Sequence, residues 1–136
     1  MDSVALGLLK QSGAESIQIK RPIVVGVMST GNELILGTPQ DNTPGKIPDV
    51  NRPILLSLLS SFGNCEVVDL GMERDDDVKA MARTIDSALQ KCDVIITTGG
   101  ISMGKSNIVA QVLVNHCGGK LHFGRMHMKP GRYRGE

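Results

Sequence analysis

The sequence predicts an α/β domain with three layers (α/β/α), in which helices cover both faces of a mostly parallel sheet. Short apolar runs rich in valine and isoleucine alternate along the chain with amphipathic stretches of helical period, and this alternation is typical of parallel sheets. The chain has 136 residues, with two Phe, one Tyr and no Trp. We therefore expect one domain with an aliphatic core.

The first 20 residues are expected to be a linker or the tail of a preceding domain, and the α/β domain is expected over residues 21–136. Residues 4–10 predict the end of a helix, Gly13 a break, and residues 17–20 a short strand. The apolar run over residues 4–9 is too short for a signal peptide or a membrane span, so no membrane span is expected.

The regular pattern starts at residues 23–28, an apolar run rich in β-branched side chains that predicts a buried strand. Residues 29–50 contain three glycines and three prolines and predict a long loop, and loops of this length are usually functional or disordered. Asn51 is expected to cap a helix whose apolar stripe lies over residues 54–61, and Gly63 to end it.

The second half of the chain repeats this alternation. Residues 65–70 predict a strand, and Asp75 or Asp76 is expected to cap a helix that extends to Gln90. Three further elements are predicted: a strand over residues 93–97, a helix that starts at Ser106 or Asn107 and stops at Gly118, and a strand that begins over residues 121–123. Because ligands of parallel sheets bind beyond the carboxyl ends of the strands, the segments after the strands are the candidates for a site.

Polar residues follow the first two predicted strands. The hydroxyls of Ser29 and Thr30 can donate to an anion, and Glu33 either holds a hard cation through oxygen or caps the backbone amides of a turn. The acids after the second strand favour the dipole of the following helix and supply its cap. One of them could also pair with Glu33 around Mg²⁺, which often takes one or two carboxylates together with a substrate phosphate.

The most informative segment, residues 97–104, follows the third predicted strand. Its paired glycines let the backbone approach a ligand closely, and its successive amides, its hydroxyls and the helix N-terminus behind it suit phosphate. The segment matches neither the P-loop nor the dinucleotide-binding fingerprint. A tight turn from strand to helix is therefore the alternative interpretation.

Charge and cysteine content exclude several kinds of partner. The formal net charge is +1 and aromatic side chains are scarce, so neither a global positive field nor base stacking predicts nucleic-acid binding. The three cysteines form no CxxC pair. We therefore expect them to be reduced thiols, and the protein to be cytoplasmic. The basic residues after position 115, Arg125 and Lys129 among them, either face an anion or belong to a solvated tail.

Six segments occur in the order and context of one known family. They are STGNEL over residues 29–34, PGKI over 44–47, Asp49 with the pair NR at 51–52, DLG over 69–71, TGGISMG over 98–104 and MKPG over 128–131. Together, over residues 21–131, they resemble the molybdopterin-binding domain of the molybdenum insertase family. That family includes the bacterial insertase, the E domain of its plant counterpart and the C-terminal part of gephyrin.

The resemblance implies a three-layer, molybdopterin-binding-domain-like fold and the last step of molybdenum cofactor synthesis. In that step adenylylated molybdopterin is cleaved, molybdate is inserted at the dithiolene and AMP is released, with Mg²⁺ assisting. Glu33 and Asp75 match acidic, metal-side residues of the active cleft, and Lys129 matches a basic residue of the substrate or molybdate site. The residues matched to cofactor binding are Ser29, Thr30, Gly31, Asn51, Thr98, Gly99, Gly100, Ser102, Gly104, Asn107, Arg125, Pro130 and Gly131.

The chain also departs from the family pattern. Asn107 stands where relatives usually carry Asp, and Val50 where a Ser is usual, so a carboxylate and a hydroxyl are missing. The chain reads KPGRY over residues 129–133 where relatives continue KPGKP, and a later loop and closing helix do not follow. We therefore expect a domain that is incomplete at its C-terminal end and lacks a complete active site in isolation.

Two alternative functions belong to the same resemblance. One is a catalytically impaired, gephyrin-like scaffold domain with protein partners. The other is the related molybdopterin adenylyltransferase domain, which shares the fold and the Thr-Gly-Gly loop, although residues 51–52 and 128–131 favour the insertase side. The resemblance also implies a homo-oligomer, because relatives with the whole chain dimerise and stand-alone domains of this fold often trimerise.

Overall fold

The computed structural model describes residues 2–37, 44–99 and 108–123. Its centre is a parallel sheet of three strands in the order β4-β1-β5, in which β1 spans Ile23–Thr30, β4 Cys65–Glu73 and β5 Val94–Thr98. Both neighbours of β1 run parallel to it. The mostly parallel sheet predicted from the alternating pattern is confirmed.

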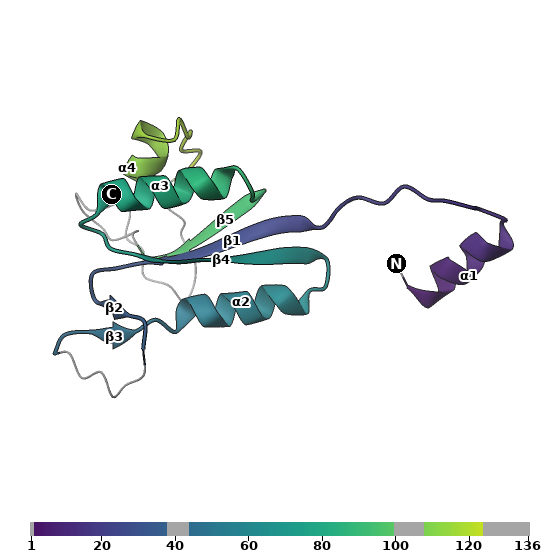
Figure 1. Cartoon of the computed structure of the whole chain (residues 1–136), viewed down its shortest axis with the longest axis horizontal. Coiled ribbons are helices and arrows are strands. Elements are labelled where there is room, and N and C mark those ends of the chain that lie inside the picture. Colours follow the sequence, from purple (N-terminus) through teal and green to yellow (C-terminus); the bar gives the residue numbers. More distant parts are fainter. Residues whose placement is uncertain (1, 38–43, 100–107, 124–136) are drawn as a thin grey trace.

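Helices cover both faces of this sheet. The helix α2 (Asn51–Ser61) lies on one face, and α3 (Val78–Leu89) and α4 (Ile108–Asn115) lie on the other (Figure 1). The predicted three-layer fold is therefore confirmed.

The core is aliphatic and lies between the sheet and α3 and α4. Its buried members come from β1, α3 and α4 and are Met28, Met81, Ile85, Val109 and Val112. The residues from α3 are four apart and those from α4 three apart, so each pair lies on one face of its helix. This core agrees with the scarcity of aromatic residues in the sequence.

Two helix starts differ from the prediction. Asn51 does not cap α2, because it is already the first helical residue; the cap position is Val50, which makes no side-chain cap bond. Asp49 acts instead, its carboxylate accepting from the backbone N–H of Arg52 at 3.3 Å.

The start of α3 also differs from the prediction. Its cap is Asp77, which accepts from the N–H of Ala80 at 2.9 Å, and not Asp75 or Asp76. Strand β4 extends three residues further than predicted, to Glu73, because residues 71–73 pair with the end of β1. That extension shifts the following helix along the chain.

The predicted loop over residues 29–50 contains ordered structure. Strand β1 continues into it, and two short strands, β2 (Leu34–Ile35) and β3 (Ile47–Pro48), pair in parallel. The N–H of Ile47 donates to the Glu33 carbonyl at 2.8 Å, and the N–H of Asp49 donates to the Ile35 carbonyl at 3.1 Å. This pairing brings both ends of the loop to the edge where β1 ends.

One predicted strand is wrong, and the described part of a second, whose continuation lies outside the described residues, is not a strand. Residues 17–20 and 121–123 are exposed and belong to no strand of the part described. Extended backbone becomes a strand only when it pairs with a neighbour, and neither segment finds one there.

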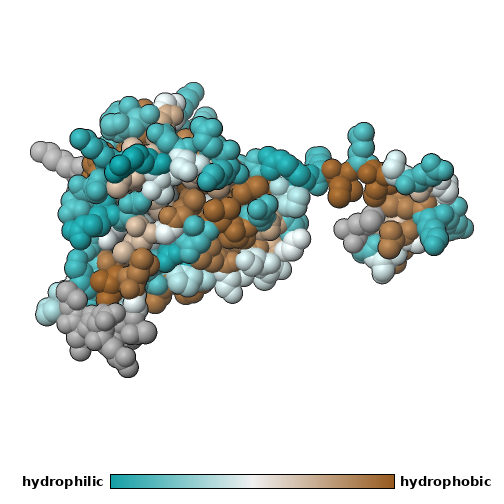
Figure 2. Space-filling view, viewed as in Figure 1, coloured by the Kyte–Doolittle hydropathy of each residue, from teal (hydrophilic) through white to brown (hydrophobic). Residues whose placement is uncertain are grey.

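The N-terminal helix is confirmed as α1 (Ser3–Gln11), with the Asp2 carboxylate accepting from the N–H of Ala5 at 2.8 Å. It stands apart from the α/β layers, at the end of an extended segment (Figure 1). Hydrophobic side chains are visible along that segment (Figure 2), where Ile17 is 43% and Ile19 77% exposed. No described helix has the length and apolar character needed to cross a membrane.

Candidate functional site

A pocket of about 140 Å³ lies at the carboxyl ends of β1 and β5. Its walls come from the end of β1, from β2 and β3, from the start of α2 and from the end of β5. The lining residues are Thr30, Glu33, Leu34, Ile47, Pro48, Asp49, Val50, Asn51, Thr98 and Gly99. This is the edge at which parallel sheets place their ligands.

The pocket brings together five of the residues that the sequence singled out: Thr30, Glu33, Asn51, Thr98 and Gly99. Ser29, Gly31 and Asp75 do not line it. Eight further candidates lie outside the described residues: Gly100, Ser102, Gly104, Asn107, Arg125, Lys129, Pro130 and Gly131.

Parallel pairing of β1 with β5 places Ser29 beside Thr98. Their hydroxyl oxygens, Oγ and Oγ1, are 2.9 Å apart and share a hydrogen bond. Ser29 is fully buried, whereas Thr98 reaches the pocket. Ser29 therefore stands behind the wall and Thr98 forms part of it.

Thr30 offers a free hydrogen-bonding group. Its side chain is 1% exposed, and its Oγ1 has no partner among the described residues. Buried polar atoms are nearly always paired, with protein or with ordered water. Because Thr30 lines the pocket, a ligand or a water there would satisfy this hydroxyl.

Arg52 ties the pocket wall to the sheet. Its Nε donates to Asp49 Oδ2 at 2.8 Å, and its Nη1 lies 2.5 Å from each carboxylate oxygen of Asp69 on β4. The side chain of Arg52 is 10% exposed, that of Asp49 3% and that of Asp69 48%. The segment between β3 and α2 is thereby fixed against β4.

Asp49 is ionised in this environment. Burial would raise the pKa of its carboxyl, but hydrogen bonds from the side chain and the backbone N–H of Arg52 hold that pKa below its usual value. A negative charge therefore lies in the pocket wall at neutral pH.

The sequence analysis included Asp49 in a family motif but did not identify it as a residue of the pocket wall. The spacing of three to Arg52 hints at a local ion pair. The bonds from Arg52 to Asp69 join residues of two different elements, and only the fold shows them.

The acidic residues expected around a metal lie near this edge but do not form a closed site. The carboxylate of Glu33 folds over Gly31, where an added Cβ would come within 2.8 Å of its Oε2. The Oδ1 atoms of Asn32 and Asp75 are buried and unpartnered among the described residues. In the described ranges no three His, Cys, Asp or Glu side chains gather as metal ligands.

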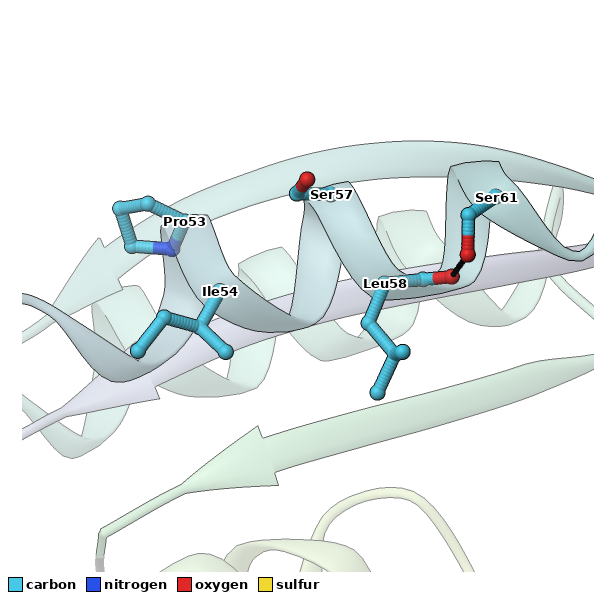
Figure 3. A pocket seen from close by; sticks show the side chains of 5 residues that line it. All are labelled: Pro53, Ile54, Ser57, Leu58 and Ser61. Carbon is cyan, nitrogen blue, oxygen red and sulfur yellow. Dashed lines mark hydrogen bonds between the residues drawn. The ribbon is translucent and has the colours of Figure 1, made fainter.

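A second hollow runs along α2 and is lined by Pro53, Ile54, Ser57, Leu58 and Ser61 (Figure 3). Its lining is largely apolar, and the Ser61 hydroxyl already donates to the Leu58 carbonyl at 2.6 Å. The lining holds no titratable side chain. The strand-end pocket is therefore the better candidate for chemistry.

Comparison with known proteins gives a consistent result. The family model described as "Probable molybdopterin binding domain" matches residues 26–135. The chain is 35% identical over 130 residues to "Molybdopterin molybdenumtransferase" of Haemophilus influenzae, covering 95% of this chain and 31% of that protein. It is 32% identical to "Gephyrin" of Dictyostelium discoideum, covering 93% of this chain and 19% of that protein.

Solved structures agree with these relatives. The crystal structure of the molybdopterin biosynthesis protein MoeA from Pyrococcus horikoshii superposes with a TM-score of 0.63 at 27% identity, over 85% of this chain and 27% of that chain. The chain thus spans about three tenths of the length of the molybdenumtransferases it matches.

Proposed function

Because the chain belongs to the molybdopterin-binding domain family, with a role in molybdenum cofactor biosynthesis, we propose that its strand-end pocket binds adenylylated molybdopterin. Within a longer protein, the domain would insert molybdate and release AMP. The chain covers only 31% of the transferase from Haemophilus influenzae, so further domains would complete the active site.

One observation carries this proposal. Three separate segments deliver Thr30, Glu33, Asn51 and Thr98 to one pocket at the ends of parallel strands. Hydroxyls, an amide and a carboxylate are the groups that hydrogen-bond the polar edges of a pterin or a nucleotide. Lys129 and Arg125 match basic positions of the family and would face the anionic groups of the substrate and molybdate.

Mg²⁺ fits the donors present, provided that the substrate supplies further oxygens. Mg²⁺ is commonly bound through one or two carboxylates together with substrate phosphates. Glu33 at the pocket and Asp75, whose buried Oδ1 lacks a partner among the described residues, would hold it. When bound, it would neutralise charge on the phosphate oxygens.

Substrate binding is the first test. Non-denaturing mass spectrometry and calorimetry of the chain should show a complex with adenylylated molybdopterin. Thr30→Val removes the buried unpartnered hydroxyl at nearly constant shape, so it should weaken binding about fivefold to tenfold while stability is kept. Ser57→Ala, in the hollow along α2, is the matched control and should bind normally. A chain that binds neither molybdopterin nor its adenylylated form contradicts the proposal.

A scaffold role is the second candidate function, and one observation favours it. Val50 lines the pocket where relatives usually carry Ser, and Asn107 replaces a carboxylate. Both changes would weaken catalysis and leave the fold intact. A cytoplasmic homo-oligomer with protein partners would suit this role.

Activity of the longer protein separates the candidates. Efficient rescue of a strain that lacks its molybdenum insertase would contradict the scaffold role. Release of AMP from adenylylated molybdopterin is expected for an insertase, whereas release of pyrophosphate from ATP would instead identify an adenylyltransferase.

A further inference from the structure

Asp69, the first residue of the DLG segment, does not line the pocket, but its carboxylate joins two parts of the fold. Both of its oxygens lie 2.5 Å from Nη1 of Arg52, the second residue of α2. Its Oδ1 also accepts from the backbone N–H of Gly71 at 2.8 Å. One contact therefore leads to the helix that begins at the pocket, and the other leads along β4.

The contact with Gly71 lies at a β-bulge. Along β1, Val27 is paired with Asp69 and the next residue is paired with Gly71. Leu70 is therefore an extra residue of β4. Gly71 has a φ of +80°, in the left-handed region that glycine adopts readily. Bulges of this kind redirect the strand that follows them and are common next to active sites.

The bulge changes the side of the sheet that the following side chains face. In a regular strand, residues four apart face the same side. Asp69 meets α2 on one side, whereas the carboxylate of Glu73 accepts from the hydroxyl of Thr84 on α3, on the other side (Figure 1). Beyond the bulge, β4 still pairs with β1 as far as Thr30. The bulge is therefore fixed relative to Thr30, which lines the pocket.

Arg52 carries the other contact of Asp69 to a second wall of the pocket. Its Nε donates to Asp49 Oδ2 at 2.8 Å, and its backbone N–H donates to Asp49 Oδ1 at 3.3 Å. Asp49 and Asn51 both line the pocket. The wall that holds Asn51 and the strand end that holds Thr30 are thus connected through Asp69.

We propose that Asp69 is a positioning residue of the pocket: it sets the spacing between Asn51 and Thr30. It acts through Arg52 and through the bulge, without touching the ligand. The identity of the ligand rests on the proposed function. Because small displacements of binding groups weaken the hold on a ligand strongly, loss of this connection should lower the affinity while the fold is kept.

Asp69→Asn separates the two contacts of the carboxylate. The amide oxygen can still accept from the N–H of Gly71, whereas the charge that holds Arg52 is lost. The side chain of Asp69 is 48% exposed, and Arg52 retains its bond to Asp49. The variant should therefore fold.

The position of the wall can be measured without a ligand. Residual dipolar couplings of the whole chain should show that the N–H vectors of residues 49–52 turn relative to those of β1 in Asp69→Asn. Unchanged couplings would overturn the proposal. If Asp69→Asn does not fold, Arg52→Lys weakens the same connection from its other end, because a single ammonium replaces the fork of donors. It is measured in the same way and judged by the same outcome.

Asp93→Asn is the matched control. The carboxylate of Asp93 also holds a guanidinium, that of Arg21, and accepts a backbone N–H, that of Val24 at 2.9 Å. It lies before β5, at the end of the sheet away from the pocket. Only Asp69→Asn should change the couplings of residues 49–52 and the affinity for the ligand. Equal changes in both variants would mean a general loss of stability and would overturn the positioning role.

The effect on the ligand is measured with adenylylated molybdopterin. Asp69→Asn should weaken binding about threefold to tenfold. Added to Asn51→Ala, it should weaken binding by less than about twofold, because the residue that it positions has been removed. Added to Thr30→Val, it should keep its full effect, because the bulge contact is intact. Equal losses in the two backgrounds, or wild-type affinity in Asp69→Asn alone, would overturn the proposal.

The two proposals fail in different ways. If the couplings change as expected but neither the wild type nor any variant binds the ligand, the proposed function is wrong, while Asp69 still positions the wall. If the wild type binds the ligand but the couplings of residues 49–52 are unchanged in Asp69→Asn, the positioning role is wrong and the proposed function stands.

Discussion

Gly99, at the end of β5, shows how tightly the pocket wall is built. Its φ is +88°, in the left-handed region, and an added Cβ would lie 2.2 Å from the carbonyl oxygen of Thr30. The first property makes any side chain strained, and the second makes it collide with the backbone of the neighbouring strand. Only glycine lets β1 and β5 end side by side at the pocket.

Gly99→Ala should therefore destabilise the protein by more than the usual cost of a left-handed alanine, about 1–2 kcal/mol. Gly71→Ala is the matched control, because Gly71 has a φ of +80° and nothing within 4 Å of an added Cβ. Urea denaturation of both variants measures the difference. Equal losses of stability would mean that the close approach to Thr30 does not constrain the wall.

For this residue the sequence predicted a close backbone contact but not the residue that makes it. Paired glycines after the third strand indicated a close backbone approach. The structure shows that Gly99 approaches Thr30 of the adjacent strand. The two residues are neighbours in space but far apart in the sequence. Glycines in the sequence predict that another part of the backbone comes close. Which residue comes close depends on the order of the strands in the sheet.

The junction between β3 and α2 depends on one cation. Among the residues that the structure describes, Arg52 is the only charged residue that is buried as a whole, and it joins Asp49, before α2, to Asp69 on β4. Asp49 and Asn51 both line the pocket. The position of the wall therefore depends on an ion pair between two elements, in addition to apolar packing.

Arg52→Met should lower the free energy of unfolding by about 3 kcal/mol, because it leaves the buried Asp49 carboxylate without its cation. Arg52→Lys should recover part of the loss, since an ammonium restores the charge but not the fork of donors. Arg74→Met removes an exposed pair with Asp76 and should change stability little. Equal effects of the two Met variants, measured by denaturation, would contradict a structural role for Arg52.

The elements that were predicted correctly have strong local patterns. The stripe on α3 buries Met81 and Ile85, and its period of 3.6 is visible in the sequence. The pair β2 and β3 has two residues in each strand, too few for any periodicity. The start of α3 was missed for another reason, because pairing of residues 71–73 with β1 decided that boundary.

At the scale of the whole molecule, the described residues form a layered domain and a separate N-terminal helix (Figure 1). Helix α1 buries none of its residues, and all residues from 11 to 23 are exposed. The first firm attachment to the domain is at Arg21, whose guanidinium meets the Asp93 carboxylate at 2.5 Å and 2.6 Å. This arrangement suits a domain boundary near residue 20, which the change in sequence pattern also indicates.

Removal of residues 1–20 should leave the domain folded, because a nine-residue helix that buries nothing contributes little. Denaturation of the shortened chain should give a free energy of unfolding within about 0.5 kcal/mol of the full chain. Arg21→Gln in the full chain is the positive control, because it removes the ion pair with Asp93 at this boundary.

The expected behaviour of that control depends on pH. The hydrogen bond from Arg21 is the main reason that the pKa of Asp93 falls to about 2. A depressed carboxyl pKa stabilises the fold above the unfolded value of about 4 and loses that effect as the pH falls toward 2. Arg21→Gln should therefore be less stable than wild type at pH 7, and the two should converge near pH 2. If the shortened chain is destabilised at pH 7 to the same extent as Arg21→Gln, residues 1–20 belong to the folded unit and the boundary lies elsewhere.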